Sequence, residues 1–242
     1  MTNRSSAALS DPGLVRSVNQ DSYHIDPQKR FFIVADGMGG HAGGEEASQI
    51  AVKTIQNYID TYWHTETSSE ELLQAAIKQA NDNIIADQYT HPERADMGTT
   101  CVLVMFRNGQ SWCAHIGDSR LYRFRDKSLE QITEDHTWVA RAMKMGDLSE
   151  EQVKTHPWRH VLFQCLGRKD LRQVDVSPID IQPGDTLILC SDGLTEEVSD
   201  AEITSYLLEE NLEREEIVKN LIEAAKQAGG SDNITVVMVT ED

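Results

Sequence analysis

Residues 31–45 read Phe-Phe-Ile-Val-Ala-Asp-Gly-Met-Gly-Gly-His-Ala-Gly-Gly-Glu, and the rest of the chain can be arranged around this stretch. Its first five residues are apolar, which is typical of a buried strand. Asp36 follows that run, and a glycine-rich loop then leads into a helical pattern. A carboxylate at the end of a buried strand is held rigidly, and glycines let a ligand approach the backbone. The same residues also fit a turn in which Asp36 only caps and the glycines serve tight packing, so both interpretations stay open.

The segment before this strand is polar and ends in a turn. Residues 14–25 are typical of short extended segments, and residues 26–29 (Asp-Pro-Gln-Lys) carry a turn signal. We therefore expect a hairpin that brings Arg16 and Asp21 close to Asp36.

Two amphipathic helices and a series of strands are expected after the glycine-rich loop. Apolar residues recur at helical spacing in two segments, and β-rich or alternating runs separated by turn signals indicate strands. Residues 1–10 are small and polar and predict only a loose lead-in. We expect helices at about 47–62, 69–87 and 213–228, another helix after the capping box at 199–202, and strands at 99–106, 111–116, 121–125, 186–190 and 234–239.

The composition limits the class of protein. The chain has 242 residues, of which 39% are hydrophobic and 26% charged, so it can bury a sizeable core and is globular. Its formal net charge of −18 argues against nucleic acid or an anionic membrane surface as the partner. The cysteines lack paired spacing, which predicts free thiols in a reducing compartment. We see no signal peptide and no apolar run of about 20 residues. We expect one cytoplasmic, monomeric domain spanning residues 1–242.

Four aspartates share one sequence context, beside a glycine or another small residue at the end of an apolar strand. They are Asp36, Asp118, Asp192 and Asp232. A buried carboxylate is costly unless it is paired or bound to a metal. The four either scatter as turn residues or converge at one edge, and converging like charges call for cations. Oxygen ligands without a Cys/His pattern select hard ions such as Mg²⁺ or Mn²⁺.

Such a cluster of ions is suited to phosphate chemistry. The metals neutralise phosphate oxygens and lower the pKa of a bound water. A guanidinium can grip the same phosphate in fork geometry. Arg16 is the leading candidate for that role, and Arg120 is the rival, with a structural role as its alternative.

Six short motifs occur in one order along the chain. They are Asn19-Gln20-Asp21, Ala35-Asp36-Gly37-Met38-Gly39-Gly40-His41, Gly98-Thr99-Thr100, Gly117-Asp118-Ser119-Arg120, Ser191-Asp192-Gly193-Leu194 and Ser231-Asp232-Asn233-Ile234-Thr235. In residues and order they resemble the signature of the bacterial metal-dependent serine/threonine protein phosphatases of type 2C. The resemblance covers about residues 13–239. Within that family the chain looks most like the compact cyanobacterial members, whose implied substrate includes the phosphorylated PII signalling protein.

The resemblance implies a fold and a set of roles. The implied fold is α+β, a four-layer αββα sandwich of two mainly antiparallel sheets flanked by helix pairs, with a flap at about 135–173 that touches the protein substrate. The implied cofactors are two Mn²⁺ or Mg²⁺ ions in the core and a weaker third. By family pattern Asp36 bridges the two core ions, the Gly37 carbonyl binds the second ion, and Asp192 and Asp232 complete the ligand set of the first ion. Asp118 and Asp192 hold the third ion. Asp21 hydrogen-bonds metal-bound waters, and Arg16 binds the phosphate.

The implied reaction is hydrolysis of phosphoserine or phosphothreonine by direct attack of a metal-bridging hydroxide. No Cys-x₅-Arg phosphate loop is present, which agrees with attack without a phosphoenzyme. His41 is the candidate for protonating the leaving oxygen. Here the chain departs from the eukaryotic members, which place a histidine directly after Asp-Gly where this sequence has Met38.

Two alternatives remain open. One is a pseudophosphatase that binds a phosphoprotein or regulates a partner without turnover. The other is a phosphatase for a small phosphate ester, which would need a narrower pocket. Loss of a metal aspartate would indicate the pseudophosphatase, and none is lost in this sequence.

Overall fold

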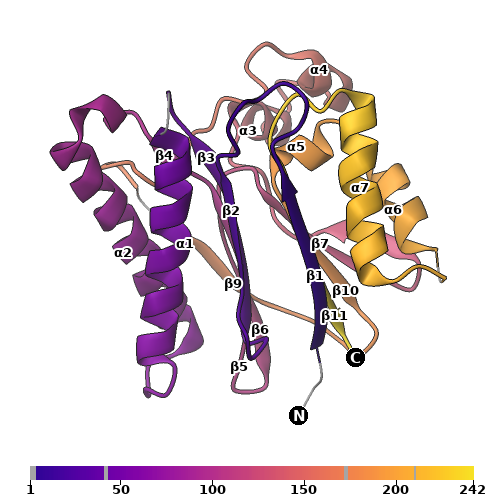
Figure 1. The fold of residues 1–242 in the computed structure, drawn as a ribbon, viewed down its shortest axis with the longest axis horizontal. Helices are drawn as coiled ribbons and strands as arrows, with labels where there is room; N and C mark the ends of the chain where they lie inside the picture. Colours follow the sequence, from indigo (N-terminus) through magenta and orange to yellow (C-terminus); the bar gives the residue numbers. More distant parts are fainter. Residues whose placement is uncertain (1–3, 41–42, 172–173, 210) are drawn as a thin grey trace.

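Two antiparallel sheets lie face to face in this computed structural model, with a layer of helices on each outer side (Figure 1). The structure describes residues 4–40, 43–171, 174–209 and 211–242. The α+β sandwich expected from the sequence is therefore confirmed. No helix among these residues is long and apolar enough to cross a membrane.

The elements follow the chain in a mixed order of strands and helices. The strands are Arg4–Asp11 (β1), Asp21–Ile25 (β2), Phe31–Met38 (β3), Gly98–Thr99 (β4), Cys101–Arg107 (β5), Gln110–Ile116 (β6), Arg120–Arg125 (β7), Ser128–Gln131 (β8), Asp175–Ile179 (β9), Thr186–Cys190 (β10) and Ile234–Glu241 (β11). The helices are Gly43–Tyr62 (α1), Ser69–Thr90 (α2), the 3₁₀ turn Pro92–Arg94 (η1), Trp138–Lys144 (α3), Glu150–Thr155 (α4), Asp192–Thr195 (α5), Asp200–Leu207 (α6) and Arg214–Ala228 (α7).

One sheet has the strand order β2-β3-β5-β6-β9, with β4 paired to the end of β3. Helices α1 and α2 cover its outer face, because their apolar stripes pack against alternate side chains of β3 and β5 such as Ile33 and Leu103. The other sheet has the order β1-β11-β10-β7-β8, and α6 and α7 cover its outer face.

A third apolar cluster lies between the two sheets. Phe32 and Val34 of one sheet meet Leu189 and Val237 of the other. The central strands are thus buried on both faces, which explains why they read as continuous apolar runs rather than as an alternating pattern. Because these strands are buried on both faces, they form a rigid base for the loops at their ends.

The N-terminal lead-in expected from the sequence is wrong. Residues Arg4–Asp11 form strand β1, which pairs with β11 from Arg4 opposite Glu241 to Asp11 opposite Ile234. The strand is at the sheet edge, and of its eight residues only Ala7 is buried. Its small and polar residues therefore carry no local strand signal, and its pairing partner lies at the other end of the chain.

One end of the sandwich gathers the loops that carry the aspartates. Figure 1 shows α3, α4, α5 and the loop between β1 and β2 at this end, opposite the two chain termini. Segments far apart in sequence therefore meet there.

Candidate metal centre

Asp36 and Asp21 face each other across neighbouring strands. In the antiparallel pairing of β2 with β3, Asp21 lies directly opposite Asp36. Strand β3 was expected to end at residue 35, but it continues to Met38 because Gly37 and Met38 pair with Thr99 and Gly98 of β4. Asp36 is consequently fixed by strand pairing on both sides.

The other three aspartates come from turns at the same end of the two sheets. Asp192 is the first residue of α5, directly after β10 and Ser191. Asp232 precedes β11, which is hydrogen-bonded to β10. Asp118 lies in the turn between β6 and β7. The predicted convergence is observed, since the charges of these groups act on one another's pKa values.

Burial and mutual repulsion together raise the pKa values of these carboxyl groups. Burial is the main cause for Asp36, and the charges of Asp21, Asp192 and Asp118 add to it, so that its pKa lies well above the ordinary value. Burial likewise raises the pKa of Asp118, with Asp192 as the next cause. Burial also raises the pKa of Asp192; its contact with Asp36 opposes that rise, and the charge of Asp232 adds to it.

Asp21 is held from behind by two hydroxyl groups. Ser191 Oγ and Thr235 Oγ1 each donate to Asp21 Oδ2 at 2.7 Å. Burial nevertheless raises the pKa of Asp21 to about 7, and the charges of Asp192 and Asp232 contribute, while the two hydroxyl bonds oppose the rise. Only one of its oxygens is thus satisfied by the protein.

The second oxygen of Asp21 and one oxygen of Asp192 have the character of cation ligands. Among the described residues, neither Asp21 Oδ1 nor Asp192 Oδ1 has a hydrogen-bond partner, although both are buried. Leaving a buried carboxylate oxygen without a partner is energetically unfavourable. Such oxygens are the ligands that hard divalent cations prefer. The residues present therefore fit a Mg²⁺ or Mn²⁺ centre.

The backbone of Asp36 is clamped by a pair of threonines. Thr100 Oγ1 accepts from Asp36 N at 2.9 Å, and Thr100 N donates to the carbonyl of Asp36 at the same distance. Thr99 Oγ1 donates to that carbonyl as well, at 2.8 Å. Both threonines stood in a motif, but the sequence alone assigned them no role.

The glycines near Asp36 serve close backbone packing. A Cβ on Gly37 would lie 2.0 Å from the carbonyl oxygen of Gly44, and one on Gly44 would lie 2.6 Å from the carbonyl oxygen of Gly37. Strand β3 can therefore approach the first turn of α1 only with glycine at both positions. The packing interpretation of these two glycines is correct, and the metal-binding role of the Gly37 carbonyl stays a prediction.

Arg16 reaches the centre from the loop between β1 and β2. Its Nη2 lies 2.8 Å from Asp232 Oδ2, and its side chain is 53% exposed, so it stands at the solvent side of the carboxylates. Asn233 anchors the loop, since its Nδ2 donates to the carbonyls of Pro12 and Val18 and its Oδ1 accepts from Gln20 N. Sequence reasoning did not identify this role of Asn233.

Arg120 has a structural role. Its guanidinium makes a bidentate ion pair with Asp135, with Nη2 to Oδ2 at 2.7 Å and Nε to Oδ1 at 2.9 Å, and its Nη1 donates to the hydroxyl of Tyr122. These bonds commit its donors to the protein, so the rival candidate for the phosphate-gripping residue is disfavoured.

Two histidines were relevant to the site, one predicted and one missed. His41, the predicted acid, lies outside the described residues. His160, in the segment expected to be a flap, has its Nδ1 2.5 Å from Glu196 Oε1, and ligand atoms of His160, Asp192 and Glu196 lie within 4.8 Å of one another. Burial, with the charge of Asp192, raises the pKa of Glu196 to about 7. No sequence pattern linked these three residues.

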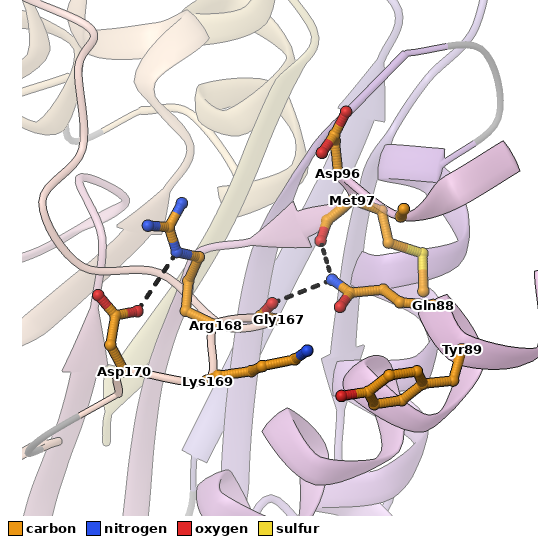
Figure 2. Close-up of a pocket in the computed structure, with 9 residues that line it drawn as sticks. Gln88, Tyr89, Asp96, Met97, Gly167, Arg168, Lys169 and Asp170 are labelled. Carbon is orange, nitrogen blue, oxygen red and sulfur yellow. Dashed lines mark hydrogen bonds and ion pairs between the residues drawn. The ribbon is translucent and has the colours of Figure 1, made fainter. Parts of the chain in front are cut away.

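A cavity of about 500 Å³ lies apart from the carboxylates, between the end of α2 and residues 167–170 (Figure 2). Three of its charged side chains contact one another or a ring: Arg168 pairs with Asp170, and Lys169 lies over the ring of Tyr89. Gln88 donates to the carbonyls of Met97 and Gly167 and so closes its wall. None of the five aspartates is among the described residues that line it, and we assign it no role.

Comparison with known proteins agrees with this centre. The sequence model of the protein phosphatase 2C family matches residues 15–230. The serine/threonine protein phosphatase PstP of Mycobacterium tuberculosis is 38% identical over 234 residues, which are 96% of this chain and 44% of that protein. The serine/threonine phosphatase stp of Listeria monocytogenes is 35% identical over 237 residues, which are 96% of this chain and 94% of that protein.

Solved structures agree as well. The crystal structure of the M. tuberculosis phosphatase PstP/Ppp superposes with a TM-score of 0.91 at 36% identity and covers 99% of both chains. The catalytic domain of PstP in complex with two manganese ions superposes with a TM-score of 0.86 at 35% identity, over 98% of this chain and 97% of that one. The chain belongs to the protein phosphatase 2C family. It spans less than half the length of its mycobacterial relative.

The raised pKa values predict how the metal-free protein responds to pH. A carboxyl group whose pKa is higher in the folded state binds more protons when folded, so stability falls as pH rises between its unfolded and folded pKa values. For Asp21 that window runs from about 4 to about 7, and the raised pKa values of Asp36 and Asp118 act in the same direction. His24, His115 and His160 have lowered pKa values, so their effects on stability fall below pH 6.5.

We therefore expect the metal-free protein to lose stability as the pH rises from 6.5 through about 7, by up to about 1.4 kcal/mol per pH unit for each carboxyl still protonated in the folded state. Denaturant unfolding in EDTA measures this slope, and excess Mn²⁺ should flatten it. A metal-free protein whose stability is constant over this range would show that the carboxylates do not repel one another.

Proposed function

We propose that this protein is a Mn²⁺- or Mg²⁺-dependent phosphoprotein phosphatase that hydrolyses phosphoserine and phosphothreonine. The observation that carries the proposal is the convergence of Asp21, Asp36, Asp118 and Asp192, whose pKa values are all raised, with an unpartnered buried oxygen on Asp21 and another on Asp192. Serine/threonine phosphatases among its relatives, one of them solved with two manganese ions, support it.

Each carboxylate has a proposed part. Asp36, the Gly37 carbonyl, Asp192 and Asp232 hold two ions in the core, and Asp118 with Asp192 holds a weaker third. Asp21 orients water through the oxygen that its two hydroxyl partners leave free. When bound, the ions supply positive charge for the phosphate oxygens and a water of lowered pKa as the nucleophile.

Arg16 is the proposed phosphate-binding residue. It is exposed beside Asp232, so its remaining donors can receive a phosphate that approaches from solvent. His41 stays the proposed proton donor to the leaving oxygen. The alternative phosphate-binding residue, Arg120, has its donors bonded to Asp135 and Tyr122.

The activity itself is the first test. Purified protein should hydrolyse p-nitrophenyl phosphate and a phosphothreonine peptide with Mn²⁺, and EDTA should stop both reactions. Re-addition of Mn²⁺ in excess of the chelator should restore them. Full activity in chelator would contradict the metal mechanism, and metal binding without any hydrolysis would favour the pseudophosphatase.

Asp36→Asn should abolish turnover while the protein stays folded. Losing a direct ligand should cost more than the ~100-fold that loss of an outer partner costs. Because the substitution also removes one repelling carboxylate, the metal-free variant should be at least as stable as the metal-free native protein. Circular dichroism melting in EDTA and p-nitrophenyl phosphate hydrolysis in Mn²⁺ measure the two effects. Retained activity would remove Asp36 from the centre.

Arg16→Ala should raise the KM for phosphopeptide by about 10- to 100-fold, the equivalent of one charge-assisted hydrogen bond. The kcat should change less, because Arg16 does not belong to the metal ligands. Arg214→Ala is the matched control, since Arg214 is also part-exposed and ion-paired but bonds the C-terminal residue Asp242, at the opposite end of the sandwich. An equal effect of both substitutions would contradict a specific role for Arg16.

A protein substrate is favoured by the surface of the segment 135–173. Trp138 and Trp158 form an edge-to-face pair and are 39% and 55% exposed, and Met145 is 69% exposed. Exposed aromatic and methionine side chains are enriched where proteins bind one another. We propose this segment as the flap that contacts the substrate, and we propose the phosphorylated PII signalling protein as a substrate on the basis of the likeness to cyanobacterial members. Turnover of a panel of phosphoproteins that includes phospho-PII would test this choice.

We also propose a cellular location and an oligomeric state for the protein. All four cysteines are free and buried, which supports a reducing, cytoplasmic location. We further propose that residues 1–242 act as one monomeric catalytic domain.

A further inference from the structure

A buried histidine pair lies next to the carboxylate centre and has no part in the function so far. His115 is the last but one residue of β6 and is 3% exposed, and His136 lies in the segment after β8 and is 5% exposed. Their rings stack with centroids 4.4 Å apart. With Asp175 at the start of β9 they form a group whose ligand atoms lie within 4.8 Å of one another.

Hydrogen bonds explain this group without a metal ion. His136 Nδ1 accepts from Gly117 N at 3.1 Å, and His136 Nε2 donates to Asp175 Oδ2 at 3.1 Å. His115 Nε2 donates to the carbonyl of Gly117 at 2.9 Å. A backbone N–H can only donate and a carbonyl can only accept, so these partners fix the proton positions on both rings.

The two histidines hold the Gly117 peptide from both sides. In addition to the ring contacts, His136 N donates to the carbonyl of Gly117 at 2.9 Å. Gly117 has a φ of +104°, and a Cβ on it would lie 2.5 Å from Thr100 Cγ2. This backbone conformation is one that other residues rarely adopt, and it directly precedes Asp118.

The same turn is attached to the Asp36 clamp on its other side. Thr100 Oγ1, which accepts from Asp36 N, also lies 2.6 Å from Ser119 Oγ. Asp118 is thus suspended between Thr100 and His136. Both neighbours are buried and hydrogen-bonded, so a change at either one moves the Asp118 carboxylate relative to Asp192 and Asp36.

His136 is also the second residue of the flap segment 135–173. Its carbonyl accepts from Phe163 N at 3.0 Å, its ring lies 5.4 Å from that of Phe163, and Thr137 bridges to Leu162. The outgoing and returning parts of the flap segment therefore meet at His136, one residue from its start.

We propose that His136, assisted by His115, is a positioning residue that sets the Gly117–Asp118 turn for the weaker third metal ion and ties that turn to the flap. The inference rests on the proposed function for the role of Asp118. We assign His136 no contact with substrate, because the ring nitrogens of His136 are bonded to Gly117 and Asp175.

Two substitutions test the hydrogen bonds of the two ring nitrogens of His136 one at a time. His136→Asn places an amide oxygen near the position of Nδ1 and can keep the bond from Gly117 N. His136→Gln reaches the position of Nε2, so it can keep the bond to Asp175 but leaves Gly117 N without its acceptor. Asp175→Asn is the control that changes the Asp175 contact alone.

We expect His136→Gln to bind two Mn²⁺ ions as the native protein does and the third about 10- to 100-fold more weakly, as measured by titration calorimetry. Its kcat should be low at limiting Mn²⁺ and recover at high Mn²⁺. In metal-free protein, hydrogen exchange of the peptide that contains Gly117 should be faster than in the native protein. His136→Asn and Asp175→Asn should resemble the native protein in all three measurements.

The outcomes are distinguishable. If the native protein neither binds Mn²⁺ nor hydrolyses phosphopeptide, the proposed function fails. If the native protein is active and His136→Gln binds the third ion normally, or if the Asn and Gln variants are equally impaired, the positioning role is overturned. Should His136→Gln not fold, His115→Phe keeps the ring stack and removes one donor to Gly117, and unchanged third-ion binding in that variant would likewise overturn the inference.

Discussion

Repulsion among buried carboxylates is the constraint on which the arrangement of this protein depends. Asp36 has Asp21, Asp192 and Asp118 within range of its charge, and burial removes the water that would screen them. Without metal, the folded chain accommodates this charge by holding protons, because burial and the neighbouring charges raise the pKa of Asp21 to about 7 and hold the pKa of Asp36 well above its ordinary value. The rigid frame keeps the carboxylates together although they repel. That stored repulsion favours divalent cations, which relieve it, and it gives the ions a fixed geometry in which to meet a phosphate.

The frame achieves this through strand pairing rather than through any single loop. Asp21 and Asp36 are cross-strand partners in one sheet, while Asp192 and Asp232 adjoin neighbouring strands of the other. Asp118 lies in the connection between the sheets, from β6 to β7. Neighbouring side chains then hold three of the aspartates or the backbone beside them: Thr100 at Asp36, Ser191 and Thr235 at Asp21, and His136 at Gly117, which precedes Asp118. Asp21 Oδ1 and Asp192 Oδ1 are left without a hydrogen-bond partner among the described residues.

Much of the fold and the aspartate cluster could be predicted from the sequence, because buried strands and helical stripes leave strong periodic signals and because Asp-Gly or Asp-Ser steps mark the strand ends. The edge strand β1 could not, since its residues are small and polar and its partner β11 lies at the far end of the chain. The supporting hydrogen bonds could not be predicted either. Asn233, Thr235 and His136 look ordinary in sequence, and their roles arise only when residues separated by long stretches of chain meet. The contact of His160 with Glu196 is of the same kind. Arg120 shows the opposite case, in which a suggestive sequence position proves to be occupied by a structural ion pair.

The most direct test of this account is the proton release that accompanies Mn²⁺ binding. If the carboxylates hold protons because they are buried and repel one another, the metal must displace those protons. Titration calorimetry at pH 7 in buffers of different ionisation enthalpy should therefore show tight binding of two ions with net release of protons, and the release should diminish as the pH is raised toward 9. Binding without proton release at pH 7, or no binding at all, would contradict the central claim that buried, mutually repelling carboxylates form the metal centre.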